Sequence, residues 1–365
     1  MMHFFKVKLI DLYITRKFLG TFFFSIALIM MIVVVFDISE KIGDFIDRKA
    51  PLKAIAFDYY LNFIPYFANL FSPLFVFISV IYFTSRMAYR SEFIAILSSG
   101  VSFNRIVFGP YLASAMVIAL LSLWLNHFVI PKANKVRLEF EELYIRDPFN
   151  YKDHNIHRQI APGTIVYFNY YLADKKICQQ FSLEKVEDGK RTFHLRSDFA
   201  QWDTLKQAWK IHNYFIREIN GMEENIRKGF EMDTVINFFP TDLERRITNI
   251  EMMDYFQLRE FIAEEKQKGA LNTEVYEVEA LKRTAFPFAT FVLTFIGVSI
   301  ASRRVRGGIG LHIGWGIGLS FSYILLMQVG SQMAIKGGFP SLPAIWLPNI
   351  IFLGIAIYLL KKAQK

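Results

Sequence analysis

The stretch Arg86-Met-Ala-Tyr-Arg-Ser-Glu-Phe-Ile-Ala-Ile-Leu-Ser-Ser-Gly-Val-Ser-Phe-Asn-Arg105 divides the chain, because it is a short polar break between two long apolar segments. On a helix with about 100° per residue, its apolar residues fall on one side: Tyr89, Phe93, Ile96 and Leu97. The opposite side carries small residues and a lone carboxylate: Ser91, Glu92, Ala95, Ser98 and Ser99. We predict an amphipathic helix over about residues 86–100 that ends at Gly100. Such a helix can lie along a membrane surface with its small-residue side open to a protein partner.

The regions on either side of this stretch are too apolar for a soluble core. The chain of 365 residues is 53% hydrophobic and contains 38 Phe, which favours a membrane protein. Five windows contain no Lys, Arg, Asp or Glu, and a sixth begins after a Gly/Pro-rich start: residues 18–36, 59–85, 106–130, 284–302, 307–335 and about 342–360. Each reaches the roughly 18–20 residues that a helix needs to cross a bilayer. We predict six transmembrane helices in two membrane halves, residues 1–131 and 273–365.

Basic residues near the ends of these windows set the orientation. If the N-terminus is cytoplasmic, the inside segments contain thirteen basic and two acidic residues, whereas the short outside loops contain five of each. The formal net charge of +9 is therefore an orientation signal and not a nucleic-acid patch. We predict that both termini and the 86–105 segment are cytoplasmic. The first apolar run lacks a small-x-small cleavage site, so it is expected to remain as a span.

The long segment between the third and fourth windows has a different pattern. From about residue 156 to residue 239 the apolar residues recur every second position, and Asp188-Gly189 and Asn220-Gly221 are hairpin turn signals. Helical patterns flank this region, from Lys132 to about Tyr144 and from Asp254. We predict an antiparallel β domain, a sandwich or an open barrel, within residues 132–272. Its only cysteine is Cys178, so an internal disulfide is excluded.

Four motifs along the chain together resemble one known family. They are Tyr13-Ile-Thr-Arg16 before the first span, Ser91 to Ser102 in the polar break, Glu279, Arg283 and Pro287 at the fourth span, and Trp346-Leu-Pro348-Asn349 at the sixth. Their order resembles the LptF/LptG (YjgP/YjgQ) permeases, the membrane subunits of the lipopolysaccharide exporter. The resemblance covers both membrane halves and the layout of three spans, a β domain and three spans. The short length slightly favours the LptG-like type.

The resemblance implies an α-helical protein of the bacterial inner membrane with an inserted, periplasmic, β-jellyroll-like domain. Members of the family pair with a second LptF/LptG-type permease and with an LptB-like dimer of cytosolic ABC ATPases. They extract lipopolysaccharide and pass it to LptC/LptA-like jellyroll proteins. A coupling helix of these permeases docks in a groove of the ATPase, and Glu92 occupies the position of its acidic residue. Ser91, Ala95, Ser99 and Gly100 surround it.

In this family the first and fifth helices form lateral gates, and the resemblance implies the same role for the first and fifth helices of this chain. Some members place basic residues near the outer end of the first span. In this chain valines occupy those positions, and Lys41 is the nearby candidate for such a basic residue. In the fifth span Gly310, Gly314 and Gly318 have the spacing that lets helices approach closely, as static packing or as a hinge. Glu279 and Arg283 form either a gating pair or an ordinary surface pair at i and i+4.

Alternation in the β domain predicts which side chains line a jellyroll interior that shields acyl chains. The predicted lining residues are Phe193, Leu195, Trp209, Ile211 and Phe215.

Motifs of known catalytic sites are missing from the sequence. It contains no Gly-x-x-x-x-Gly-Lys-Ser/Thr phosphate loop, no His-Glu-x-x-His and no Gly-x-Ser-x-Gly. We therefore expect no catalytic residues, no cofactor and no metal site, and a transporter subunit that takes energy from a partner ATPase. Two alternatives stay open: a non-transporting membrane anchor whose β domain binds an envelope partner, and another type of ABC exporter permease, which typically has four spans.

Overall fold

The computed structural model describes residues 8–145, 155–172, 175–187, 189–221, 223–240, 247–267, 273–302 and 308–363. The chain divides into two compact units. The first contains Met1–Ile145, Met252–Tyr255 and Glu274–Lys365, and the second contains Arg146–Glu251 and Phe256–Thr273. The charged helix after the third span groups with the first unit, up to Ile145.

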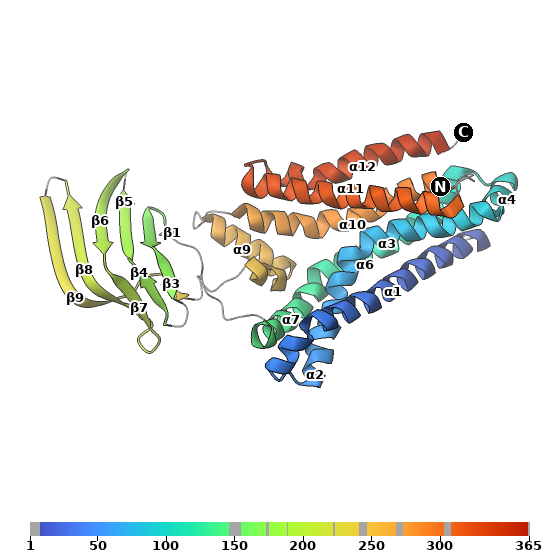
Figure 1. Ribbon diagram of the computed structural model, residues 1–365. Coiled ribbons are helices and arrows are strands. Elements are labelled where there is room, and N and C mark those ends of the chain that lie inside the picture. The colour runs from blue at the N-terminus through green and yellow to red at the C-terminus, as the bar shows by residue number, and fades with distance from the viewer. Residues whose placement is uncertain are drawn as a thin grey trace. The chain divides into compact units, whose positions relative to one another are not determined.

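Six helical segments of the first unit are long and apolar enough to span a membrane, which confirms the prediction of six transmembrane helices (Figure 1). Short π-helical turns, η1 to η3, interrupt two of them. The segments are α1 (Leu9–Asp47); α2 (Leu52–Ala54), η1 (Ile55–Tyr60) and α3 (Leu61–Tyr89); α5 (Phe103–Ile106), η2 (Val107–Tyr111), α6 (Leu112–Trp124), η3 (Leu125–Val129) and α7 (Ile130–Tyr144); α10 (Thr273–Ala301); α11 (Gly308–Lys336); and α12 (Ser341–Ala363).

Helix α3 contributes side chains to two apolar clusters of the first unit. Phe77 and Ile81 of α3 belong to a buried apolar cluster with residues of α10, α11 and α12. Val76 and Val80, on the adjacent part of the helix surface, belong to a second cluster with α1 and α6. Because lipid is as apolar as these side chains, association depends on close packing and on hydrogen bonds between helices. Asn69 of α3 supplies one such bond, donating from Nδ2 to Asn126 Oδ1 over 2.8 Å.

The second unit contains an antiparallel sheet, as the alternating pattern predicts. The strands are β1 (Ile156–Ala161), β2 (Thr164–Phe168), β3 (Tyr170–Leu172), β4 (Ile177–Gln179), β5 (Ser182–Glu187), β6 (Lys190–Arg196), β7 (Phe199–Asp203), β8 (Ala208–Asn220) and β9 (Glu223–Thr234). Their order is β1-β2-β5-β6-β8-β7-β4-β3, and β9 pairs with the other side of β8 (Figure 1). An open sheet of this kind is compatible with a jellyroll-like domain.

Both predicted hairpins form. Gly189 (φ 74°) lies in the turn between β5 and β6, and Gly221 (φ 67°) lies in the turn between β8 and β9. These positive φ angles favour glycine. Asp188 of the first turn signal lies outside the described residues. A third hairpin, which the sequence analysis does not identify, joins β1 to β2 at Gly163, where a Cβ would lie 2.3 Å from the carbonyl oxygen of Val186.

A row of polar residues crosses the sheet where the strands change partners. Backbone bonds connect Asn155 to Asn169, Asn169 to Gln179 and Gln180 to Asp198, and the side-chain amide of Asn213 donates to Asp198 Oδ2 over 2.8 Å. Along this row the long strand β8 passes from pairing with β7 to pairing with β6. We name it the 155–213 row.

One face of the sheet packs into a single apolar cluster. Trp209 is fully buried in it, and its indole nitrogen donates to the carbonyl oxygen of Phe238 over 2.7 Å. Cys178 is a free thiol in the same cluster, and burial raises the pKa of that thiol. Helix α9 (Tyr255–Gln267) confirms the helix expected after Asp254.

Candidate functional site

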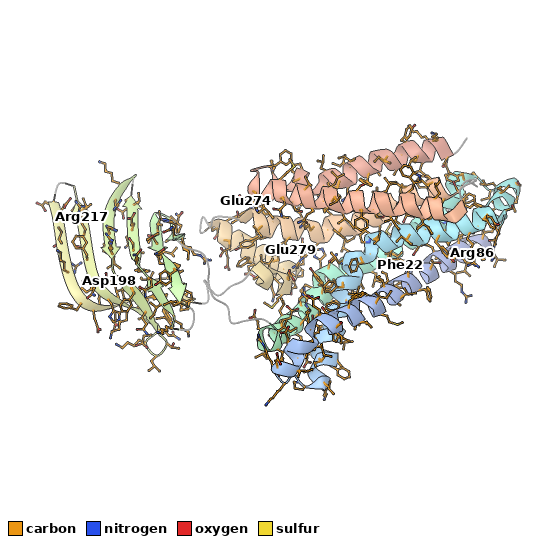
Figure 2. The ribbon with its side chains drawn as sticks, viewed as in Figure 1. Phe22, Arg86, Asp198, Arg217, Glu274 and Glu279 are labelled. Atoms are coloured by element: carbon orange, nitrogen blue, oxygen red, sulfur yellow. The ribbon has the colours of Figure 1, made fainter. Side chains whose placement is uncertain are left out.

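The 86–105 segment folds differently from the single helix that we predicted. Residues 86–89 belong to the end of α3, which stops at Tyr89, and the next helix, α4, covers only Glu92–Ser98. Ser91 between them adopts φ 60°, which an α-helix cannot contain. The predicted end at Gly100, with φ 87°, fits the observed helix end at Ser98 within two residues. Arg86 lies near the C-terminal end of α3 (Figure 2).

The apolar side of α4 packs on the protein. Phe93 is buried, and Ile96 is partly buried, in the cluster that contains Ile14 and Phe18 of α1. Tyr89 and Leu97, which we placed on the same side, are exposed instead, as is Ile94. The reason is the turn at residues 90–91, which separates Tyr89 from the helix to which the sequence pattern assigned it.

Glu92 is held by α1. Its Oε2 atom accepts a hydrogen bond of 2.9 Å from the hydroxyl of Tyr13, and Arg90 Nη1 lies 3.9 Å from its Oε1. The carboxylate is still about one-third exposed. A partner could therefore reach Glu92 while Tyr13 holds it in place.

A second polar contact joins the same two parts of the chain. Arg105 binds Asp11 in a two-pronged ion pair, with Nη1 to Oδ1 at 2.8 Å and Nη2 to Oδ2 at 2.6 Å. A Cβ at Gly109 would lie 2.5 Å from Arg105 Nη1, so the missing side chain makes room for the guanidinium group. The contacts of Asp11, Tyr13 and Arg105 could not be predicted from the sequence, because pairs 79 and 94 residues apart leave no local pattern.

The other residues predicted to couple to an ATPase are accessible to a partner. Ser91, Ala95, Ser99 and Gly100 are all exposed. Ser91 and Ala95, together with Glu92 and the exposed apolar residues of α4, form a small surface that nothing in the chain's described part covers. We name this surface, formed by Ser91, Glu92, Ile94, Ala95 and Leu97, the α4 surface.

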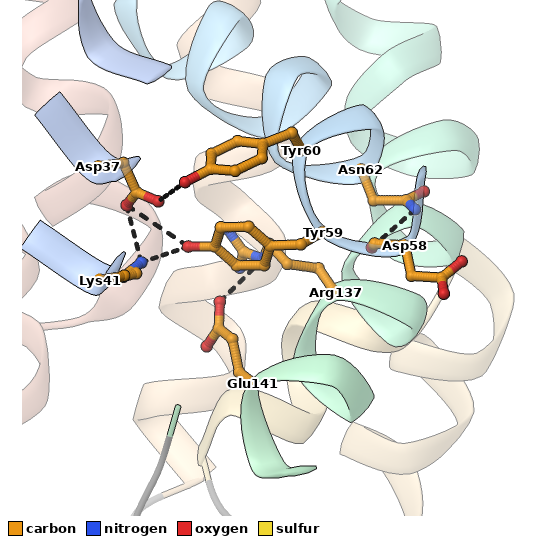
Figure 3. Close-up of polar contacts among 8 residues, drawn as sticks. All are labelled: Asp37, Lys41, Asp58, Tyr59, Tyr60, Asn62, Arg137 and Glu141. Carbon is orange, nitrogen blue, oxygen red and sulfur yellow. Dashed lines mark hydrogen bonds and ion pairs between the residues drawn. The ribbon is translucent and has the colours of Figure 1, made fainter. Parts of the chain in front are cut away.

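Lys41 lies in a compact polar cluster (Figure 3). Its ammonium group donates to Asp37 Oδ1 over 2.7 Å and to the Tyr59 hydroxyl, and it lies 4.9 Å from the centre of the Tyr59 ring. The Tyr60 hydroxyl donates to Asp37 Oδ2 over 3.0 Å. We name Asp37, Lys41, Tyr59 and Tyr60 the Asp37 cluster. It ties α1 to η1, and the carboxylate of Asp37 compensates the charge of Lys41, the basic candidate near the outer end of the first span.

The predicted glycine stripe of α11 is not packed against this chain. A Cβ at Gly310, Gly314 or Gly318 would meet nothing within 4 Å. Two other glycines of α11 make the close contacts: a Cβ at Gly316 would lie 2.6 Å from Ile81 Cδ1, and one at Gly330 would lie 2.4 Å from the carbonyl oxygen of Ala344. The described residues of this chain therefore supply no packing partner for the stripe, because spacing alone does not indicate which side of a helix meets a neighbour.

Glu279 and Arg283 do form the predicted pair on α10, with Arg283 Nε 3.4 Å from Glu279 Oε1. Figure 2 labels Glu279 near the start of that helix. Arg283 is nevertheless buried, and its Nη1 donates to the carbonyl oxygen of Met253 over 2.6 Å. The interpretation as an ordinary surface pair is wrong for Arg283, which fastens the chain at Met253 to α10.

The predicted β-domain lining splits into two groups. Leu195, Trp209 and Ile211 are buried in the apolar cluster, and Phe193 packs against it. Phe215 lies on the opposite face, paired with Arg196 and beneath Lys228, and Ile216 takes the buried position. The prediction for Phe215 is wrong because Asn213, with φ 52°, reverses the alternation of side chains within β8.

No group of three or more His, Cys, Asp or Glu side chains suited to a metal ion occurs within the described ranges. The basic turn residues Arg303, Arg304 and Arg306, which contribute to the predicted orientation, lie outside those ranges.

Comparison with known proteins gives one result for nearly the whole chain. The family model described as "Lipopolysaccharide export system permease LptF/LptG" matches residues 12–362. No curated protein matches the chain. The matched range includes both membrane halves, the β domain and the α4 surface.

Proposed function

The chain belongs to the LptF/LptG family of lipopolysaccharide export system permeases, and from that premise we propose that it is one permease subunit of an ATP-driven exporter. It pairs with a second permease of the same family and with a dimer of cytosolic ABC ATPases. It extracts lipopolysaccharide from the inner membrane and passes it to a periplasmic bridge of jellyroll proteins. Both termini and the α4 surface face the cytoplasm, and the β domain faces the periplasm.

The observation that carries this proposal is the α4 surface. It combines a partly exposed carboxylate with exposed apolar and small side chains on a short helix whose other side is anchored in the core through Phe93. A protein–protein interface gains affinity from an apolar patch, and it gains specificity when a charge meets a complementary charge on the partner. A basic groove on an ATPase is the partner that fits it.

Purification of the tagged chain in mild detergent tests the partner. The wild-type chain is expected to bring an ABC ATPase with it. Glu92→Ala should reduce the co-purified ATPase about tenfold, the loss expected for one contact of about 1.4 kcal/mol. Glu40→Ala removes an exposed carboxylate on a different helix, α1, and should have no effect. A membrane anchor without transport activity predicts wild-type behaviour for both variants, and a preparation without any ABC ATPase would contradict the proposal.

Two phenylalanines on opposite faces of the sheet test the lipid path. Phe193 packs against the buried face and Phe215 lies on the other one. A photoreactive phenylalanine analogue at position 193 should cross-link lipopolysaccharide when ATP is supplied, and the same analogue at position 215 should not. Equal cross-linking at both positions would contradict passage along the buried face.

Cysteine labelling in intact cells tests the orientation. Cys178 is buried and burial raises its thiol pKa, so it contributes little background. A cysteine at exposed Ser98 should react only with a membrane-permeant reagent, and one at exposed Leu205 should react with an impermeant reagent that enters the periplasm. The reverse pattern would overturn the topology.

A further inference from the structure

The 86–105 segment contacts the first span at three points. Phe93 packs in the cluster of Ile14 and Phe18, Glu92 accepts from Tyr13, and Arg105 binds Asp11. The rest of the 86–105 segment connects these points: the rings of Phe93 and Phe103 lie 6.2 Å apart, and the hydroxyl of Ser102 caps α5 by accepting from the backbone nitrogen of Arg105.

The positions of the contacts on α1 matter as much as their number. With about 100° per residue, Asp11 and Tyr13 lie on either side of the stripe that contains Ile14 and Phe18. The two polar contacts therefore flank the apolar one. Rotating α1 in either direction, or sliding it along its axis, would break at least one of them.

The contacts are strong enough to resist a rotation or a sliding of α1. A two-pronged arginine–carboxylate pair adds directional constraint to its charge attraction. The side chains of Arg105 and Asp11 are only 27% and 16% exposed, so water and salt screen the pair less than an open surface pair. Asp11 Oδ2 also accepts from the backbone nitrogen of Lys8 over 3.0 Å, which fixes the carboxylate at the first turn of α1.

From these contacts we infer that the first two turns of α1 and the 86–105 segment form one mechanical unit, with Asp11, Tyr13 and Arg105 as positioning residues. A partner that moves the α4 surface then moves the first span directly, without a path through α3. The consequence for transport rests on the proposed function, whereas the mechanical unit itself does not.

Hydrogen exchange of the full-length chain in lipid nanodiscs tests the mechanical unit. Asp11→Asn should raise amide exchange in residues 9–20 and in residues 92–105 together, by about fivefold or more in each if one coupling contact of ordinary strength is lost. Gly109→Ala should act in the same direction, because it keeps both charges and crowds Arg105 Nη1. Tyr82→Phe removes a hydroxyl that accepts from Arg86, near the same end of α3, and should change neither region. An increase in only one region, or in none, would overturn the inference.

Export measurements on the reconstituted complex test the consequence. Asp11→Asn should keep the co-purified ATPase and its hydrolysis rate, and both Asp11→Asn and Tyr13→Phe should lower the lipopolysaccharide released per ATP by about fivefold. Asp11→Glu retains the charge and should recover part of the loss, and Tyr82→Phe should match the wild type. A ratio unchanged in both Tyr13→Phe and Asp11→Asn would overturn the coupling role and leave the proposed function intact. Absence of an ATPase from the wild-type complex would instead remove the proposed function, and the exchange experiment would still decide on the mechanical unit.

Discussion

Helices α1 and α11 are the two spans with the smallest buried shares, 17% and 28% of their most apolar windows, yet they are attached in opposite ways. Polar contacts hold α1 at its two ends, the 86–105 segment at one and the Asp37 cluster at the other. Close contacts at two glycines hold α11, with the side chain of Ile81 at Gly316 and with the backbone of Ala344 at Gly330.

This difference determines what each helix tolerates. An attachment made of charges fails when one partner is removed, because the remaining charge is left uncompensated. An attachment made of glycine fails when a side chain is added, because the neighbouring atoms have no room to move. Substitutions that separate these two responses test the comparison, and the apparent free energy of unfolding in detergent is a common measure for all of them.

The largest expected effect is in the Asp37 cluster. Asp37→Ala leaves the partly buried ammonium group of Lys41 without its carboxylate and deprives Tyr60 of its acceptor. The expected loss is about 3 kcal/mol. Glu40→Ala, at an exposed site one residue before Lys41, should change stability by less than about 0.5 kcal/mol. Equal effects of the two variants would show that the cluster does not hold α1.

The second effect tests α11. Gly330→Ala adds a Cβ that would lie 2.4 Å from the carbonyl oxygen of Ala344. This oxygen is a backbone atom of α12 and cannot move alone. We expect a loss of about 2 kcal/mol. Because no charge is involved, the loss should be the same at low and at high salt. A marked salt dependence would argue against steric contact as the cause.

Asp11→Asn should have a smaller effect on stability, about 1 kcal/mol, since the pair with Arg105 is partly exposed. This loss should shrink as the salt concentration rises, in contrast to that of Gly330→Ala. Unfolding measured at low and high salt for both variants gives the comparison directly. A loss that grows with salt would rule out the ion pair as its source.

The smallest effect is expected at Gly314. An added Cβ there meets nothing within 4 Å, so Gly314→Ala should change the stability of the isolated chain by less than about 0.5 kcal/mol. It is the matched control for Gly330→Ala, on the same helix. A loss comparable to that of Gly330→Ala would mean that the open side of α11 is covered even in the isolated chain.

Much of the fold could be predicted from the sequence, because its signals are long or local. Windows without charged residues give the six spans, and the turn at Asn220-Gly221 gives the β8–β9 hairpin from two adjacent residues. Pro65 and Pro73 lie in the second window without charged residues, and both are within α3.

The missed features depend on single backbone angles or on distant partners. Ser91 and Asn213 adopt positive φ angles that the residue type does not determine. The angle at Ser91 ends the helix predicted over 86–100, and the angle at Asn213 reverses the predicted face of Phe215. The partners of Glu92 and Arg105 lie on α1, far away in the sequence, so that only the folded chain brings them together. The glycine contacts of α11 depend on where α3 and α12 lie, which spacing along one helix cannot indicate.

The 155–213 row also divides the β domain for the purposes of insertion and deletion. On either side of Asn213, strand β8 serves a different neighbour, β7 before it and β6 after it, with opposite parity on each side. Strand β9 nevertheless pairs with both halves of β8 in a single register, so a length change in β8 alone would shift one half against β9 and turn its buried side chains outward. A change of length at the row therefore keeps the register of both halves only if β9 changes by the same number of residues between Gly229 and Glu231.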